Sequence, residues 1–230
     1  MDTRVQLVVA RYQEDVSWLA DVGLPAVVYD KSGDPPAALA ATLPDHCAVE
    51  ALPNIGRETH TYLTHILRHF DALPEATVFV QGSPFQHMEE GAGPATLAAA
   101  IAQCLEKKTP FKGFAFYKLR CDGLGRPHHL HDPSSQGRWA GYGRDIPVAA
   151  TYGALFDGPP PDSFHVRAPA GCFLVRRERI LLRPRGLYET ALRLVEADPH
   201  DAANTGHAFE RLWYLVFNGY AALHKAAYPG

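Results

Sequence analysis

The 230-residue chain has only four cysteines, no long apolar run and little net charge. Cys47, Cys104, Cys121 and Cys172 are widely spaced and form no Cys-x-x-Cys pair, which argues against a structural zinc site and a disulfide framework. No apolar stretch approaches the roughly 18 residues that span a bilayer. The formal net charge of -3 gives no electrostatic reason to expect nucleic-acid or membrane-surface binding.

Several catalytic signatures are missing as well. The sequence has no Ser-His-Asp motif, no phosphate-binding P-loop and no Gly-x-Gly-x-x-Gly, so hydrolase, NTPase and dehydrogenase functions rank low. The first residues, MDTRVQLVVARY, lack a signal-peptide pattern because the apolar run is only about five residues and is followed by Arg11 and Glu14. We therefore expect a reduced, cytoplasmic protein. The sequence leaves the oligomeric state open.

The composition is that of an ordinary globular protein, with 47% hydrophobic and 20% charged residues. We expect one domain over residues 1–230. Short apolar runs typical of buried strands alternate with stretches of helical periodicity, which predicts an α/β sandwich with a mostly parallel central sheet flanked by helices. The expected strands are 5–10, 26–29, 49–52, 77–80, 111–119 and 170–176, and the main expected helices are 58–70, 94–106, 187–197 and 208–220.

The segment at about 121–161 is rich in glycine, proline and histidine. We expect a long irregular insertion here, with at most short elements. A loop of this length within a compact domain is usually functional or mobile.

Polar side chains follow the predicted strands and open the helix over 58–70. In an open α/β sheet, the strand ends and the helix starts meet on one side, where ligands bind. A guanidinium there can grip a phosphate or carboxylate, a carboxylate can accept from ribose hydroxyls, and glycine allows close backbone approach. The predicted binding residues are Arg11, Asp30, Asn54, Gly56, Arg57, Gln81, Ser83 and His87, with Glu58 and His60 as candidate catalytic groups.

Structural roles compete with these functional ones. Arg11 is equally suited to an ordinary surface salt bridge, and Asp30 to a polar turn with Lys-Ser-Gly behind it. Glu58 would also compensate the helix dipole. His60, His65 and His87 would form a metal site if the loop folds back, since a catalytic metal needs about three protein ligands.

Six motifs carry a resemblance over most of the chain: VVARYQEDVSWL, VVYDKSG, LPNIGRETHTYLTHI, TVFVQGSPFQH, AGCFLVRRERILLRP and HAFERLWYLVF. Together they resemble a bacterial and fungal family known only as domain of unknown function 3431. That resemblance implies no particular activity.

A more distant resemblance is to the nucleotide-sugar glycosyltransferases of the A fold. It is carried by Asp30, Asn54-Ile55-Gly56-Arg57, Gly171-Cys172-Phe173 and Glu210-Arg211-Leu212-Trp213. It implies a Rossmann-like single domain that transfers a sugar from a nucleotide-activated donor to a small-molecule or glycan acceptor. It also implies that Glu210 is the general base for the acceptor hydroxyl. Arg211 would bind phosphate or pair with Glu210, and an internal ion pair is the structural alternative.

One departure from the glycosyltransferases concerns the metal. Their acidic metal-binding pair is replaced here by Val80-Gln81-Gly82-Ser83-Pro84. A divalent metal on a diphosphate prefers carboxylate oxygens. The enzyme would then work without a metal, with arginine or lysine neutralising phosphate. The alternatives are a different biosynthetic enzyme on the same scaffold, using His/Glu acid–base or metal chemistry, and a non-catalytic binding module.

Overall fold

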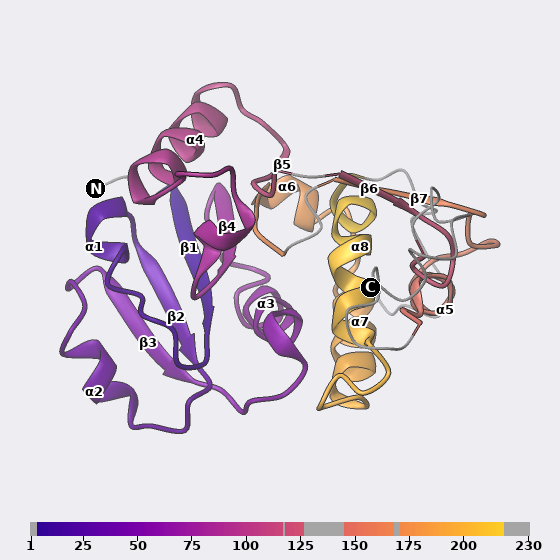
Figure 1. Cartoon of the computed structure of the whole chain (residues 1–230), viewed down its shortest axis with the longest axis horizontal. Helices are drawn as coiled ribbons and strands as arrows, with labels where there is room; N and C mark the ends of the chain where they lie inside the picture. The colour runs from indigo at the N-terminus through magenta and orange to yellow at the C-terminus, as the bar shows by residue number, and fades with distance from the viewer. Residues whose placement is uncertain (1–3, 117, 127–144, 168–170, 219–230) are drawn as a thin grey trace.

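The computed structural model describes residues 4–116, 118–126, 145–167 and 171–218 (Figure 1). The main sheet has six strands in the order β3-β2-β1-β4-β8-β5. The four strands of the first half of the chain are parallel, and β8 runs antiparallel between β4 and β5. The strands are β1 (Val5–Arg11), β2 (Ala26–Asp30), β3 (Cys47–Ala51), β4 (Ala76–Gln81), β5 (Phe111–Gly113) and β8 (Phe173–Arg176). The predicted α/β class with a mostly parallel sheet is confirmed.

Helices flank this sheet, and a small antiparallel sheet of β6 (Lys118–Cys121) and β7 (Phe164–Arg167) lies beyond α8 (Figure 1). The helices are α1 (Leu19–Val22), α2 (Pro36–Ala40), α3 (Arg57–Arg68), the 3-10 helix η1 (Pro84–His87), α4 (Pro94–Glu106), α5 (Val148–Leu155), α6 (Arg177–Ile180), α7 (Arg185–Glu196) and α8 (Thr205–Asn218). None of the helices described is both long and apolar enough to cross a membrane.

Strand β1 is buried on both faces because helices cover both sides of the sheet. Val8 and Ala10 join the core that includes residues of α3, α7 and α8. Leu7 and Val9 point the other way, into a core with α1 and α4. Successive side chains of a strand face opposite sides, so a strand covered twice must be apolar throughout. The run VQLVVA at the start of the sequence reflects this position.

The second half of the chain departs from the sequence prediction. The strand expected at 111–119 is two strands: β5 ends at Gly113, and β6 begins at Lys118 in the other sheet. The expected insertion at 121–161 contains helix α5, which packs against α8. Residues 127–144 of that insertion lie outside the described part of the chain.

The approach of α3 to α7 depends on a glycine. Gly56 precedes α3 with a left-handed backbone (φ 56°, ψ 27°), and its N–H donates to the Pro199 carbonyl at 2.8 Å. A Cβ at Gly56 would lie 2.0 Å from Cγ1 of Val195 on α7. Arg57 continues the turn with φ 52°. Only glycine therefore fits where the two helices meet.

Gly56→Ala should destabilise the protein more than Gly23→Ala. Gly23 has nearly the same backbone (φ 65°, ψ 26°), but a Cβ added there would have no atom within 4 Å. We expect Gly23→Ala to cost about 1–2 kcal/mol from backbone strain and Gly56→Ala about 1–3 kcal/mol more from overpacking. Urea unfolding of both variants measures the difference, and equal losses would show that Val195 yields without cost.

Candidate functional site

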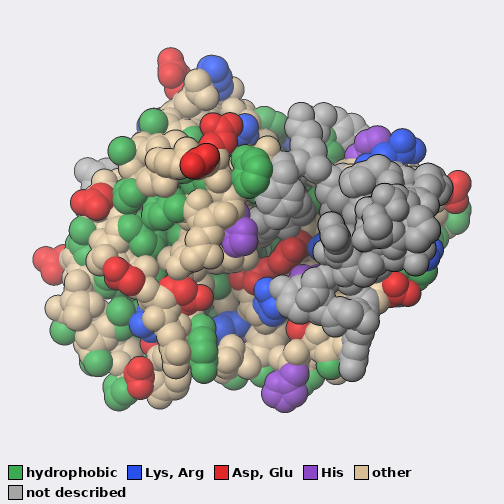
Figure 2. All heavy atoms as spheres, viewed as in Figure 1, with side chains coloured by type: hydrophobic (Ala, Val, Ile, Leu, Met, Phe, Trp, Pro, Cys, Tyr) green, Lys and Arg blue, Asp and Glu red, His purple; other side chains and the backbone are tan. Residues whose placement is uncertain are grey.

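A polar cavity of about 240 Å³ lies where the parallel strands end. Figure 2 shows acidic and basic side chains gathered in a hollow at the centre of this face. Five of the twelve predicted site residues line it, namely Arg11, Asn54, Arg57, Glu58 and Gln81, and the structure adds Glu14 and Lys31 to them. The lining residues are Ala10, Arg11, Tyr12, Glu14, Lys31, Asn54, Arg57, Glu58 and Gln81.

Arg11 and Asp30, at the ends of β1 and β2, bind each other. Arg11 Nη1 lies 2.7 Å from Asp30 Oδ1, and its Nε donates to the Glu14 carbonyl at 2.8 Å. The second oxygen of Asp30 accepts from Ser32 Oγ at 2.8 Å. The carboxylate predicted to accept from a ribose is therefore engaged within the protein, where it orients Arg11 towards the cavity.

Lys31 connects the end of β2 to the start of α3. Its side chain is buried, and its Nζ donates to the carbonyls of Ile55 at 2.8 Å and of Arg57. Burial lowers the pKa of the Lys31 amine to about 8, against an opposing effect from the Glu58 charge. The lysine thus holds the left-handed turn that carries Glu58.

Glu58, in the first turn of α3, and Glu210, on α8, form a buried pair of carboxyl groups next to the cavity. Their side chains are 6% and 14% exposed. Burial raises the pKa of Glu210 well above its usual range, and the Glu58 charge and a hydrogen bond between the two carboxyls raise it further. Arg211, 3.6 Å away, and Arg57 oppose this rise. Glu210 accordingly keeps its proton beside the Glu58 carboxyl.

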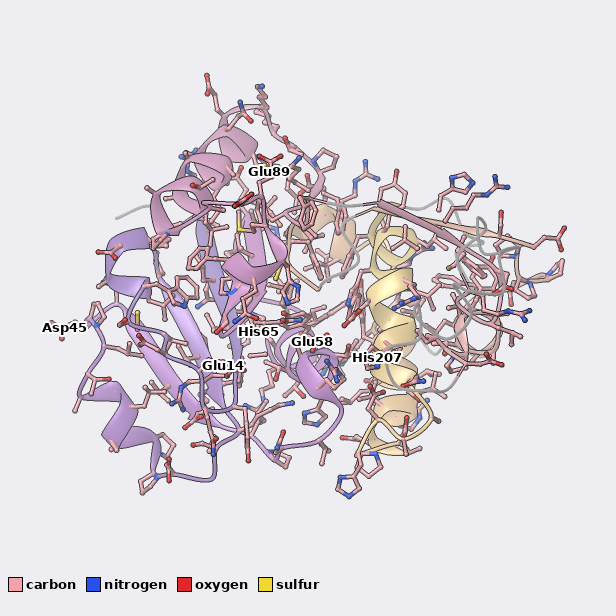
Figure 3. The ribbon with its side chains drawn as sticks, viewed as in Figure 1. Glu14, Asp45, Glu58, His65, Glu89 and His207 are labelled. Atoms are coloured by element: carbon pink, nitrogen blue, oxygen red, sulfur yellow. The ribbon has the colours of Figure 1, made fainter. Side chains whose placement is uncertain are left out.

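One oxygen of this pair has no donor. Glu58 Oε1 is buried and has no hydrogen-bond partner among the described residues. Figure 3 shows Glu58 between the start of α3 and α8, and His207 in the first turn of α8. A buried acceptor without a donor is costly, so a ligand hydroxyl or amine that donates to it would be favoured.

The aromatic side chains of Tyr62, Phe173 and Trp213 pack together next to the carboxyl pair and help to exclude water from it. Tyr62 is fully buried, its ring lies 5.9 Å from Phe173 and 6.3 Å from Trp213, and its hydroxyl donates to the Gly171 carbonyl at 2.8 Å. Burial also raises the pKa of the Cys172 thiol to about 12. Apolar surroundings disfavour a second negative charge next to Glu58.

Arg57 lies between two carboxylates. Its Nε is 3.8 Å from Glu58 Oε2 and 3.8 Å from Asp201 Oδ2. Asp201 Oδ2 in turn lies 2.6 Å from His207 Nδ1, and Asp201 Oδ1 accepts from the Gly206 N–H at 2.7 Å. Asp201 and His207 were not predicted from the sequence, because they stand in no local pattern with Arg57. The left-handed backbone of Asp201 (φ 52°) becomes visible only in the structure.

The remaining predicted residues surround this centre. Arg211 is buried and donates to the His207 carbonyl at 2.8 Å, one turn earlier on α8. His87 Nε2 lies 2.9 Å from Gln81 Oε1. Ser83 precedes η1 and does not line the cavity.

The structure separates the three histidines considered as metal ligands. His65 Nδ1 lies 3.0 Å from the Tyr29 hydroxyl in the core, and burial lowers the pKa of His65 to about 3. His60 Nε2 lies 3.9 Å from Glu196 Oε1, and burial lowers its pKa to about 4. His87 is held by Gln81. Over the described ranges, no group of three or more His, Cys, Asp or Glu side chains is placed to hold a metal ion.

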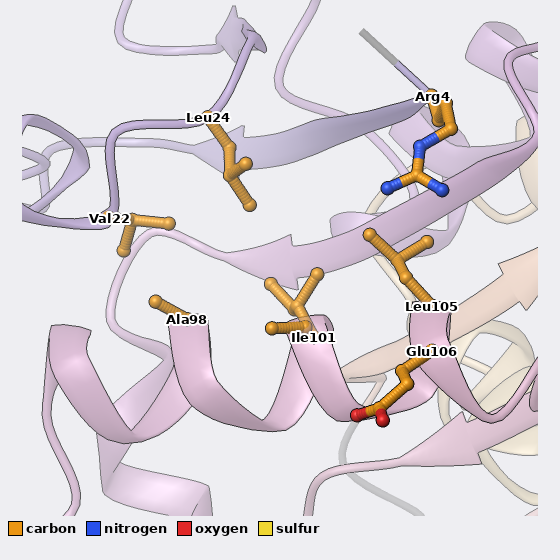
Figure 4. A pocket seen from close by; sticks show the side chains of 8 residues that line it. Arg4, Val22, Leu24, Ala98, Ile101, Leu105 and Glu106 are labelled. Atoms are coloured by element: carbon orange, nitrogen blue, oxygen red, sulfur yellow. The ribbon is translucent and has the colours of Figure 1, made fainter. Parts of the chain in front are cut away.

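A second, larger hollow of about 420 Å³ lies away from these groups (Figure 4). Its walls are aliphatic, with Val22, Leu24, Ile101 and Leu105 among them, and it is bordered by Arg4, before β1, and Glu106, at the end of α4. It therefore lies towards the opposite ends of the strands. We take the smaller polar cavity as the candidate site because it is lined by Glu58, whose carboxyl neighbours the perturbed Glu210.

Fold and site together define an α/β protein with a carboxyl pair at the carboxyl edge of a mostly parallel sheet. The chain belongs to the family described as protein of unknown function (DUF3431), whose model matches residues 7–228. No curated protein matches the sequence.

Glu210→Gln should change how stability depends on pH. Glu210 holds its proton more tightly in the folded than in the unfolded protein, so it lowers stability as pH rises above about 4.5 towards its folded pKa. The variant has no such loss, and the difference between the two proteins should grow by up to about 1.4 kcal/mol per pH unit.

Urea unfolding between pH 4.5 and 8 measures this difference. His60 and His65 titrate in both proteins and cancel from the comparison. Glu189→Gln serves as the control, because the Glu189 side chain lies exposed on α7. Parallel stability curves for wild type and Glu210→Gln would contradict the raised pKa of Glu210.

Proposed function

We propose that the protein is a transferase that moves a sugar from a nucleotide-activated donor to a hydroxyl-bearing small molecule or glycan. The observation that carries this proposal is the Glu58–Glu210 pair at the carboxyl edge of the sheet. Because Glu210 keeps its proton, Glu58 is the carboxylate of the pair that is left to accept the proton of a hydroxyl, as a general base does. The distant resemblance to glycosyltransferases of the A fold is the reason for proposing a sugar as the transferred group.

In the proposed reaction, the pair takes the proton of the acceptor hydroxyl. The hydroxyl oxygen forms a bond to the anomeric carbon of the donor sugar. The bond from that carbon to the diphosphate oxygen breaks, and the nucleoside diphosphate leaves with the electron pair. Glu58 Oε1, which has no donor among the described residues, would accept the hydroxyl proton.

Arginines would stabilise the leaving diphosphate. Arg11 and Arg57 both line the cavity. The end of β4 carries Gln81 and Ser83 in place of an acidic pair, so this strand end itself supplies no carboxylate for a divalent metal. Guanidinium groups bind phosphate oxygens bidentately and stay charged at all relevant pH values.

A different acid–base enzyme on the same scaffold is the second candidate. This candidate is favoured because two cationic side chains of the site already bind groups of the protein. Arg11 binds Asp30 at 2.7 Å, and Lys31 binds two backbone carbonyls. Fewer charges then remain to neutralise a diphosphate. Such an enzyme would use the same carboxyl pair to move a proton on a substrate without a diphosphate.

Wild-type protein should be stabilised by one class of nucleoside diphosphate or sugar nucleotide. We would measure thermal unfolding with uridine and guanosine diphosphates and their sugar derivatives, each with and without Mn²⁺. A ligand at 100 times its Kd adds about 2.7 kcal/mol to the folded state. A shift independent of Mn²⁺ agrees with the metal-free reaction. If no nucleotide shifts the transition under either condition, the sugar-transfer proposal fails and the second candidate takes its place.

Glu58→Gln and Glu210→Gln should each slow turnover by about 10²- to 10⁴-fold, because the first removes the carboxylate that accepts the proton and the second removes the carboxyl that is hydrogen-bonded to it. Release of nucleoside diphosphate from the stabilising donor, with water as acceptor, gives the rate. Donor binding should persist in both variants, and the exposed control Glu189→Gln should keep full turnover. Wild-type rates in both site variants would remove the pair from the chemistry, and binding without any turnover would leave a binding module.

A further inference from the structure

Lys31 is buried in an unusual way. Only 5% of the residue is exposed, and both of its hydrogen bonds go to backbone carbonyls, those of Ile55 and Arg57. Burying an ammonium group is costly, and carbonyl dipoles compensate it only in part. An aliphatic side chain would pack at this place without that cost. The presence of a charged hydrogen-bond donor at this buried position therefore calls for a functional explanation.

Both carbonyls belong to the left-handed turn ahead of Glu58. Gly56 and Arg57 have φ values of 56° and 52°, and a non-glycine residue in this region is strained. Lys31 itself is fixed, because its backbone N–H donates to the Arg11 carbonyl at 2.9 Å. The end of β2 thus fastens the first turn of α3 through a single nitrogen atom.

We propose that Lys31 is a positioning residue for the Glu58–Glu210 pair, which it holds in place through the turn and keeps ionisable through its positive charge. The proposal rests on the proposed function only in that the pair is taken as the proton acceptor. Lysine suits this role because one compact ammonium reaches two carbonyls that diverge from it. The planar fork of arginine has five donors and a different geometry.

The charge of Lys31 acts on Glu58, and other charged groups act on the pair as well. Arg57 and Arg211 lie within 3.8 and 3.6 Å of the two carboxylates, and both favour the ionised pair. Loss of the Lys31 charge should therefore make the pair harder to ionise without abolishing its titration. The groups that face the pair are Lys31, Arg57, Tyr62, His87, Cys172 and Arg211.

Carbon-13 NMR of protein labelled at the glutamate carboxyls tests this directly. The signals of the pair are identified by their loss in Glu58→Gln and Glu210→Gln. In Lys31→Met, we expect the titration of the pair to move to higher pH by about one unit, since an opposite charge nearby typically lowers a carboxyl pKa by 1–3 units. Lys31→Arg, which keeps the charge, should restore most of the shift. Lys112→Met, at an exposed position of β5, should leave the titration unchanged.

A purely structural lysine gives a different result. Lys31→Met would then lower the free energy of unfolding while the carboxyl titration of the folded protein stayed where it is, and this outcome overturns the proposal. If Lys31→Met does not fold, Lys31→Gln, which keeps an amide donor without the charge, takes its place.

If neither neutral variant folds, the carboxyl titration of the wild-type protein tests the role of Lys31 instead. Its carboxyl signals should then show a second step near pH 8, where Lys31 loses its proton, and no such step would overturn the proposal. None of these readouts uses a donor or an acceptor. Failure of sugar transfer and failure of the Lys31 role are therefore seen in separate experiments.

Discussion

The close approach of α3 to α7 at Gly56 is the constraint on which the site depends. Because no side chain fits between Gly56 and Val195, the first turn of α3 reaches far enough to set Glu58 against Glu210 on α8. Lys31 fastens the same turn from the side of the sheet. A buried pair of like charges would otherwise move apart, so the backbone must supply the restraint that electrostatics opposes.

The arginines of the site lie next to carboxylates that offset their charge. Arg11 is matched to Asp30, and Arg57 lies midway between Glu58 and Asp201, at 3.8 Å from each. Both of these distances are longer than the 2.7 Å ion pair between Arg11 and Asp30. A guanidinium on the cavity wall is also placed to meet an anionic ligand. The half-exposed position of Arg57 on the cavity wall agrees with that role.

Much of the fold could be predicted from the sequence because the buried parallel strands are apolar on both faces. The runs at β1, β2 and β4 are continuous and short, and the amphipathic pattern of α3 follows directly. The sequence predicted five residues of the cavity lining from the rule that ligands bind where parallel strands end and helices begin. They are Arg11, Asn54, Arg57, Glu58 and Gln81. The rule could not show that Asp30 is used internally, nor that Asp201 and His207 come next to Arg57. Those facts depend on the packing of α7 and α8, which leaves no local signal. The sequence left a metal site at His60, His65 and His87 open, because a buried histidine bound to Tyr29 looks the same in sequence as one that binds a metal.

The antiparallel strand β8 has a consequence for how the molecule folds. Strand β8 pairs with β4, where Phe79 lies opposite Phe173. The sheet formed by the first half of the chain is therefore completed by a segment that lies almost 100 residues later in the sequence. Gly171 and Cys172, just before this strand, complete the edge that Gln81 begins, and α8 brings Glu210 to it afterwards. Pairings between such distant segments cost loop-closure entropy and form slowly. The first four strands can therefore assemble as a nucleus, while the site itself is among the last parts of the protein to become native.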